Sequence, residues 1–163
     1  MRKGLALALL MLGGLVLAGP SRTGESPSEA VPAQPPSTVL DALFPTGRDT
    51  RALSALAEAE KLAQSESFRT REVGRDAHTS HHIVWIRDRE IPHRHERHDL
   101  LVVMLRGYGG MRLGKEERPV GPGSILYVPR GTMHTFRNAS GEPAAAYAIY
   151  VPPFDGIDRV TTE

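Results

Sequence analysis

The stretch that decides the fold is "GSILYVPRGTMHTFRN", residues 123–138. An apolar run leads to proline and glycine, and a histidine then opens a second run typical of a β-strand. Pro129 and Gly131 predict a tight connection between two strands, because proline fixes one backbone dihedral and glycine tolerates conformations that other residues resist. This connection presents His134 to the interior of the predicted fold.

A second stretch, "HRHERHDLLVVMLRG" at residues 93–107, places His93 and His95 two positions apart. Side chains alternate between the two faces of a strand, so both imidazoles point to the same side if the backbone is extended. Imidazole is the commonest neutral metal ligand near pH 7, and two on one face can bind one ion. His-x-His pairs also occur by chance on exposed strands, so this spacing by itself does not establish a metal site.

Residues 68–163 form the predicted domain that holds both stretches. Short β-like runs recur there at intervals of about 8–12 residues and end at glycine, proline or asparagine, which predicts an antiparallel sandwich or small barrel. The runs include "HHIVWIRD", "DLLVVMLRG", "GSILYVPRG" and "AAAYAIYVPP". The fold class is therefore all-β.

Residues 39–67 predict a helical extension before the β domain. "STVLDALFP" fits a short helical turn, and "DTRALSALAEAEKLAQSE" fits a helix that Asp49 or Thr50 can cap. Leu53, Leu56, Ala57 and Ala63 recur on one face at helical spacing, so that face is expected to pack against the domain.

The first 38 residues predict export. Residues 1–18 combine a positive start, an apolar run and a small residue before the cleavage site, which is typical of a secretory signal peptide cut after Ala18. Residues 19–38 read as a Pro/Ser-rich linker. We expect a periplasmic or secreted protein with no membrane attachment after cleavage. The chain has no cysteine, which excludes disulfides, and its net charge of +1 without a basic block gives no indication of a nucleic-acid partner.

The order and composition of the two histidine stretches resemble the two motifs of the cupin superfamily. The second motif is matched at five positions: Gly123, Pro129, Gly131, His134 and Asn138. The resemblance implies a small antiparallel double-stranded β-helix, or jelly-roll barrel, of the RmlC-like kind. It also implies a divalent metal ion inside the barrel, held by three histidines, here His93, His95 and His134, and usually by a glutamate. A homodimer is implied as well.

The first motif departs from the family at its glutamate. The glutamate position falls on Leu100 when it is counted seven residues back from Gly107. It falls on Asp99 when it is counted four residues on from His95. A one-residue difference reverses the face of a strand side chain unless a bulge absorbs it, and the apolar run after Asp99 hides which face is inward. Three ligand sets stay open: Asp99 as fourth ligand, which we favour; His98 in its place; or three histidines alone.

The predicted site indicates small-molecule chemistry. Three neutral imidazoles leave a divalent ion with its full charge, which favours an anionic organic ligand, and the ion could be Fe, Mn, Ni, Cu or Zn. We expect a metal-dependent enzyme, foremost a dioxygenase-like oxidoreductase or else an isomerase. The alternative is a non-catalytic module that binds a small ligand or metal. The interior positions are mainly aliphatic, so no catalytic acid or base is assigned.

Overall fold

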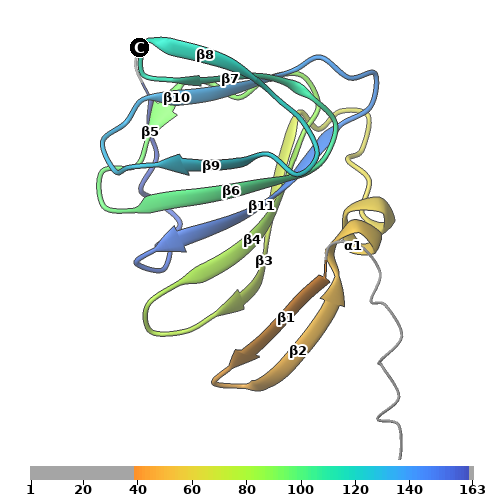
Figure 1. Ribbon diagram of the computed structural model, residues 1–163, viewed down its shortest axis with the longest axis vertical. Helices are drawn as coiled ribbons and strands as arrows, with labels where there is room; N and C mark the ends of the chain where they lie inside the picture. The colour runs from red at the N-terminus through yellow and green to blue at the C-terminus, as the bar shows by residue number, and fades with distance from the viewer. Residues whose placement is uncertain (1–38, 162–163) are drawn as a thin grey trace, which may run out of the picture. The chain divides into compact units, whose positions relative to one another are not determined.

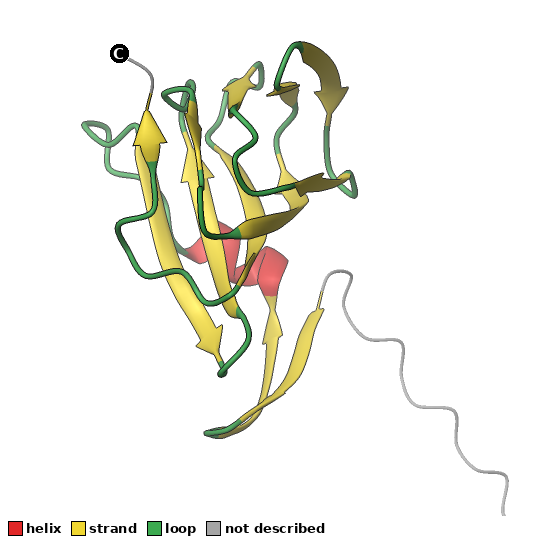
Figure 2. Ribbon diagram, turned by 90° about the vertical axis from the view of Figure 1, so that its left-hand side faces the viewer, coloured by secondary structure: helices red, strands yellow, loops and turns green. Residues whose placement is uncertain are grey.

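The computed structural model describes residues 39–161, so the predicted signal peptide (1–18) and linker (19–38) lie outside the described residues. Strands make up most of the described chain, with one short helix (Figure 2). No helix among these residues is long and apolar enough to cross a membrane.

The first sheet has five antiparallel strands in the order β3-β4-β11-β6-β9 (Figure 1). Its central strands consist largely of Val, Ile, Leu and Ala, as expected of strands that are buried on both faces. The strands are β3 (Phe68–Arg75), β4 (Ser80–Ile86), β6 (Asp99–Arg106), β9 (Ile125–Val128) and β11 (Ala144–Val151).

The second sheet also has five antiparallel strands, in the order β12-β5-β10-β7-β8. They are β5 (His93–Arg94), β7 (Gly109–Leu113), β8 (Glu116–Val120), β10 (His134–Asn138) and β12 (Val160–Thr161). In the register of this sheet His134 faces His93, so the two histidine stretches meet directly. The backbones of β7 and β10 approach closely at Gly109, where a Cβ would lie only 2.0 Å from the carbonyl oxygen of Arg137.

Both faces of the first sheet are apolar, and each covers a different core. The inner face packs against the second sheet, through residues such as Leu100 and Met104 on one side and Met111 and Phe136 on the other. The outer face forms a second cluster around Trp85, which is fully buried. These two sheets and the core between them confirm the prediction of a small antiparallel barrel.

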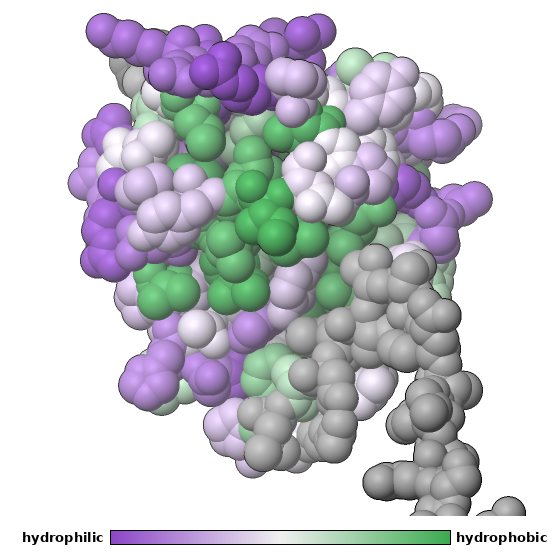
Figure 3. Space-filling model, in the orientation of Figure 1, coloured by the Kyte–Doolittle hydropathy of each residue, from purple (hydrophilic) through white to green (hydrophobic). Residues whose placement is uncertain are grey.

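Part of the outer face stays at the surface. A band of apolar side chains crosses the face shown in Figure 3, over the region where β6 and β9 lie in Figure 1. β9 is an edge strand, and its Ile125 and Tyr127 are 70% and 59% exposed. Apolar surface on a sheet edge favours association, which is compatible with the expected homodimer.

The extension over residues 39–67 differs from the helical prediction. It consists of a hairpin, β1 (Val39–Phe44) and β2 (Gly47–Ala52), followed by the short helix α1 (Leu53–Ala59). Phe44 pairs with Gly47, so Pro45 and Thr46 form a two-residue turn, and Gly47 has a φ of +123°. Cross-strand pairing thus occupies the residues that were predicted to be helical or to cap the helix.

The helical face was predicted correctly within α1, but Ala63, which was predicted to share it, lies beyond the end of the helix and is exposed. Leu53 and Ala57 are buried, and the carbonyl of Ala57 accepts a hydrogen bond from Nε1 of Trp85 at 3.2 Å. The helix ends at Ala59 because Glu60 adopts an extended conformation. α1 therefore covers part of the outer cluster.

Candidate metal centre and its cavity

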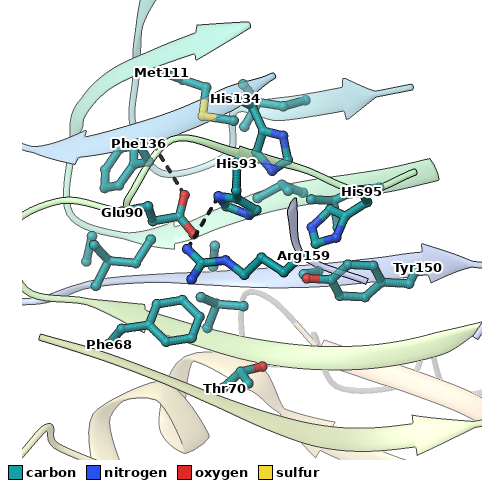
Figure 4. Close-up of a pocket in the computed structure, with 18 of the residues that line it drawn as sticks. Phe68, Thr70, Glu90, His93, His95, Met111, His134, Phe136, Tyr150 and Arg159 are labelled. Atoms are coloured by element: carbon teal, nitrogen blue, oxygen red, sulfur yellow. Dashed lines mark hydrogen bonds between the residues drawn. The ribbon is translucent and has the colours of Figure 1, made fainter. Parts of the chain in front are cut away.

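Three buried histidines converge inside the barrel. His93 opens β5, His95 follows that strand, and His134 opens β10, with exposed fractions of 3%, 3% and 2%. Each contributes a nitrogen, and these three atoms lie within 4.8 Å of one another. The structure therefore brings together the three histidines that the sequence predicted (Figure 4).

Hydrogen bonds to backbone carbonyls fix the orientation of each ring. Nδ1 of His93 bonds to the carbonyl of Ile91 at 2.9 Å, and Nδ1 of His134 bonds to that of Thr132 at 3.0 Å. Nδ1 of His95 bonds to the carbonyl of Asp158. A carbonyl can only accept, so Nδ1 carries the proton in each neutral ring and Nε2 keeps its lone pair. This is the arrangement in which histidine binds metal.

Burial keeps the three rings neutral at pH 7. The pKa is lowered to about 3 for His93 and to about 4 for His134, mainly because burial disfavours the charged ring. The pKa of His95 is lowered as well, again chiefly by burial. Neutral rings are the form that a metal ion requires.

The cluster fits a divalent ion by one further criterion. Nε2 of His95 is buried and has no hydrogen-bond partner. A buried polar atom without a partner is costly, and an ion at this point would satisfy it. Three imidazole donors suit Fe, Mn, Ni, Cu or Zn, and leave coordination positions open to a substrate.

The structure does not bring Asp99 to this cluster, which corrects its prediction as the fourth ligand. Its carboxylate bonds instead to Arg130, at 2.8 Å from Nη2 and 2.9 Å from the backbone nitrogen. Leu100 is the residue that faces inward, 5% exposed, and it lines the cavity. β6 pairs with β9 in unbroken register from Leu100 to Val103, so no bulge there reverses the face.

His98 is not placed to act as a ligand either. Its side chain is buried, but both ring nitrogens are engaged elsewhere. Nδ1 lies 2.5 Å from Oδ2 of Asp158, and Nε2 lies 3.2 Å from the carbonyl oxygen of Pro153. The three-histidine set is the alternative that agrees with the geometry.

A cavity of about 230 Å³ opens beside the histidines. Its walls are mostly apolar and come from both sheets. They include Val84, Ile86, Leu100, Met104, Met111 and Phe136. The small volume and the apolar walls suit a small organic molecule held by a few polar groups.

Glu90 supplies an acid/base group to this cavity, where the sequence predicted mainly aliphatic side chains and no catalytic acid or base. It lies in the loop before β5, and its Oε2 accepts a hydrogen bond from the backbone nitrogen of Phe136 at 3.3 Å (Figure 4). Burial raises the pKa of Glu90 to about 7, and the nearby charge of Arg159 opposes that shift. Its place three residues before His93 is the signal that sequence reasoning overlooked.

Arg159 is the second cavity residue that sequence reasoning missed. Its guanidinium lies 5.5 Å from the ring centre of Phe68, and Nη2 is 3.3 Å from Nδ1 of His93. No short motif marks this arginine, because the C-terminal segment reaches the site only through tertiary contacts. Those contacts include the pairing of β12 with β5.

Comparisons with known proteins agree with this architecture. The model of the cupin domain family matches residues 77–150. An uncharacterized protein of Aquifex aeolicus (strain VF5) is 32% identical over 104 residues, which cover 64% of this chain and 85% of that protein.

Solved structures share the fold at low sequence identity. KdgF from Halomonas sp. is 23% identical with a TM-score of 0.54, over 61% of this chain and 93% of that chain. Pac13 from Streptomyces, described as a nucleoside dehydratase, is 18% identical with a TM-score of 0.52, over 64% and 84% of the two chains. At such identities the likeness carries the fold alone. The double-sheet barrel, the family match and the enclosed histidines lead to one conclusion: the chain belongs to the cupin superfamily.

Proposed function

We propose that this protein is a metal-dependent enzyme that acts on a small anionic organic molecule and uses Glu90 to transfer a proton. The observation that carries the proposal is the position of the Glu90 carboxyl, which lines the same cavity as the three histidines. A purely metal-storing site has no use for a carboxyl group of raised pKa in its cavity.

His93, His95 and His134 would hold the metal through their Nε2 atoms. A bound divalent ion would polarise an oxygen of the substrate and attract its negative charge. The three imidazoles are neutral, so they leave the charge of the ion undiminished, and the apolar walls exclude water that would screen it.

Glu90 is suited to proton transfer by its pKa as well as its place. A group with a pKa of about 7 is present in both protonation states near neutral pH, which is the condition under which one residue can accept and return a proton. The expected reaction is removal of a proton from a carbon next to a carbonyl or carboxylate, as in isomerisation or elimination.

A dioxygenase-like oxidation is the second candidate. It is favoured by a ligand set of three neutral histidines, which leaves several coordination positions open, and by the apolar walls around them. A non-catalytic binding module would need the metal site but not Glu90. The three possibilities therefore differ in what they require of one carboxyl group.

Hydrogen exchange at carbon separates these candidates. The protein is loaded with zinc, manganese or iron and incubated in D2O with a panel of 2-oxo and 2-hydroxy carboxylates, and proton NMR follows the loss of C–H signals. We expect exchange that His134→Ala abolishes and that Glu90→Gln slows by about 100-fold or more. Oxygen uptake that survives Glu90→Gln would favour the oxidation instead. Binding without turnover would favour the module.

We further propose that the protein is exported, on the strength of the signal-like pattern in residues 1–18. N-terminal sequencing of the protein recovered from a periplasmic or culture fraction tests this, with a new terminus after Ala18 as the expected result. The homodimer is likewise a proposal, and light scattering on the purified protein measures it.

A further inference from the structure

Asp158 connects the segment that contains β12 to the loop after His95 through hydrogen bonds. Its two carboxylate oxygens accept hydrogen bonds from the backbone nitrogens of Glu96 at 3.0 Å and Arg97 at 2.8 Å. Its own carbonyl accepts the Nδ1 hydrogen of His95. The residue that follows, Arg159, is thereby held at the cavity, and both residues lie beyond the 77–150 range that matches the cupin family model.

The guanidinium of Arg159 lacks an anionic partner in the described part of the chain. Its nearest acceptor is the carbonyl oxygen of Ile91 at 3.5 Å, a long contact. Nδ1 of His93 is 3.3 Å away, but it donates to that same carbonyl and cannot also accept. No carboxylate among residues 39–161 forms an ion pair with Arg159, since Glu90 lies near it without reaching ion-pair distance.

We propose that Arg159 binds the carboxylate of the substrate, an inference that rests on the proposed function. A guanidinium presents a planar fork of donors that matches a carboxylate, and the ring of Phe68 beside it supports its orientation. Figure 4 shows the guanidinium directed between Glu90 and His93, on the side of the cavity where the histidines converge.

The position of His93 narrows the substrate class. Nδ1 of this ring lies beside Arg159, and Nε2 is available to the metal. The guanidinium and the metal, the two groups that would bind a ligand, therefore lie at opposite sides of one imidazole. A molecule that reaches both carries its carboxylate only a short distance from a second oxygen donor. In a cavity of about 230 Å³, 2-oxo and 2-hydroxy carboxylates meet this requirement.

The test compares a carboxylate with its neutral amide. NMR titration of the zinc-loaded full chain measures the Kd of 2-oxobutyrate and of 2-oxobutanamide. We expect Arg159→Gln to weaken 2-oxobutyrate binding by about 10- to 100-fold and to change amide binding by less than about threefold. Arg159→Lys should fall in between, because an ammonium keeps the charge but loses the planar fork.

Arg118→Gln is the matched control, because Arg118 is exposed and pairs with Glu116 on β8, outside the cavity lining. An Arg159→Gln variant that binds 2-oxobutyrate as the wild type does would overturn the inference. So would an equal loss for both probes, which indicates a merely structural arginine, or a wild type that binds neither probe.

Zinc content, measured on every sample, keeps this inference distinct from the proposed function. A protein that takes up zinc but does not distinguish carboxylate from amide refutes the role of Arg159 and leaves the metal site standing. A protein that takes up no metal refutes the proposed metalloenzyme. Arg159 would in that case still be tested by the carboxylate preference of the metal-free chain.

Discussion

Lowering the pH from 7 to 5 should destabilise the metal-free protein through its buried histidines. The folded-state pKa is about 3 for His93 and about 4 for His134, mainly because burial disfavours the charged ring. Both are far below the ordinary value of 6.5 that applies to the unfolded chain. Below pH 6.5 the unfolded chain therefore binds protons that the folded chain does not.

The magnitude follows from the two pKa values. Each such histidine lowers the free energy of unfolding by about 1.4 kcal/mol for every pH unit below 6.5, until the pH reaches its folded-state pKa. At pH 5, which is 1.5 units below, the loss is about 2 kcal/mol for each ring and about 4 kcal/mol for the pair. Glu90 opposes this loss, because its folded-state pKa of about 7 lets the folded chain bind a proton that the unfolded chain binds only near pH 4.5, which offsets about 2 kcal/mol at pH 5. The net loss of about 2 kcal/mol is still a substantial part of the roughly 5–15 kcal/mol that stabilises an ordinary domain.

Guanidinium unfolding of the metal-free protein at pH 7 and pH 5 measures the effect. Trp85, the only tryptophan, is fully buried, so its fluorescence reports unfolding. His134→Gln should reduce the difference between the two pH values by about 2 kcal/mol, because one of the two rings is removed. His78→Gln, a change at an exposed histidine, should leave it intact. Equal stability at both pH values in the wild type, or an unreduced difference in His134→Gln, would refute the reasoning.

Three further substitutions test the placement of the site and the sheets. Asp99→Ala should leave zinc content unchanged and cost at most about 1 kcal/mol of stability in chemical unfolding, because its ion pair is exposed; loss of zinc would restore Asp99 as a ligand. Leu100→Glu should destabilise the metal-free protein by about 3 kcal/mol, yet tighten zinc binding in calorimetry, because it adds an inward carboxylate; unchanged or weaker zinc binding would contradict this. Gly109→Ala should cost about 2 kcal/mol in chemical unfolding, since its Cβ would meet the Arg137 carbonyl, while Gly141→Ala, in open space, serves as the control.

The three-histidine centre could be predicted from the sequence because each of the two motifs that resemble those of cupins is local. One motif holds His93 and His95 two positions apart, and in the other a proline–glycine turn leads into His134. The identity of the inward residue at the start of β6 could not be predicted this way. Leu100 faces the core next to the cavity, and Val103 faces the outer cluster. Both faces of β6 are therefore apolar, and only the strands that pack around β6 determine which face points inward.

The polar groups of the cavity depend on contacts between distant parts of the chain. Glu90 is placed by a loop whose backbone pairs with β10, and Arg159 by the hydrogen bonds of Asp158 to residues about 60 positions earlier. The hairpin β1–β2 was missed for a different reason: a short segment with alanine, leucine and a cappable aspartate also suits a helix, and pairing between the two strands overrides that propensity.

The hydrogen bonds of Asp158 affect the order in which the protein folds and binds metal. The histidine loop leaves the ribosome about 60 residues before the segment that orients His95 and supplies Arg159. Until residues 158–161 dock, the three rings lack one of their carbonyl supports and the second sheet lacks its edge strand β12. Metal capture is therefore expected to follow the docking of residues 158–161, and a chain truncated before Asp158 would compete poorly for the ion.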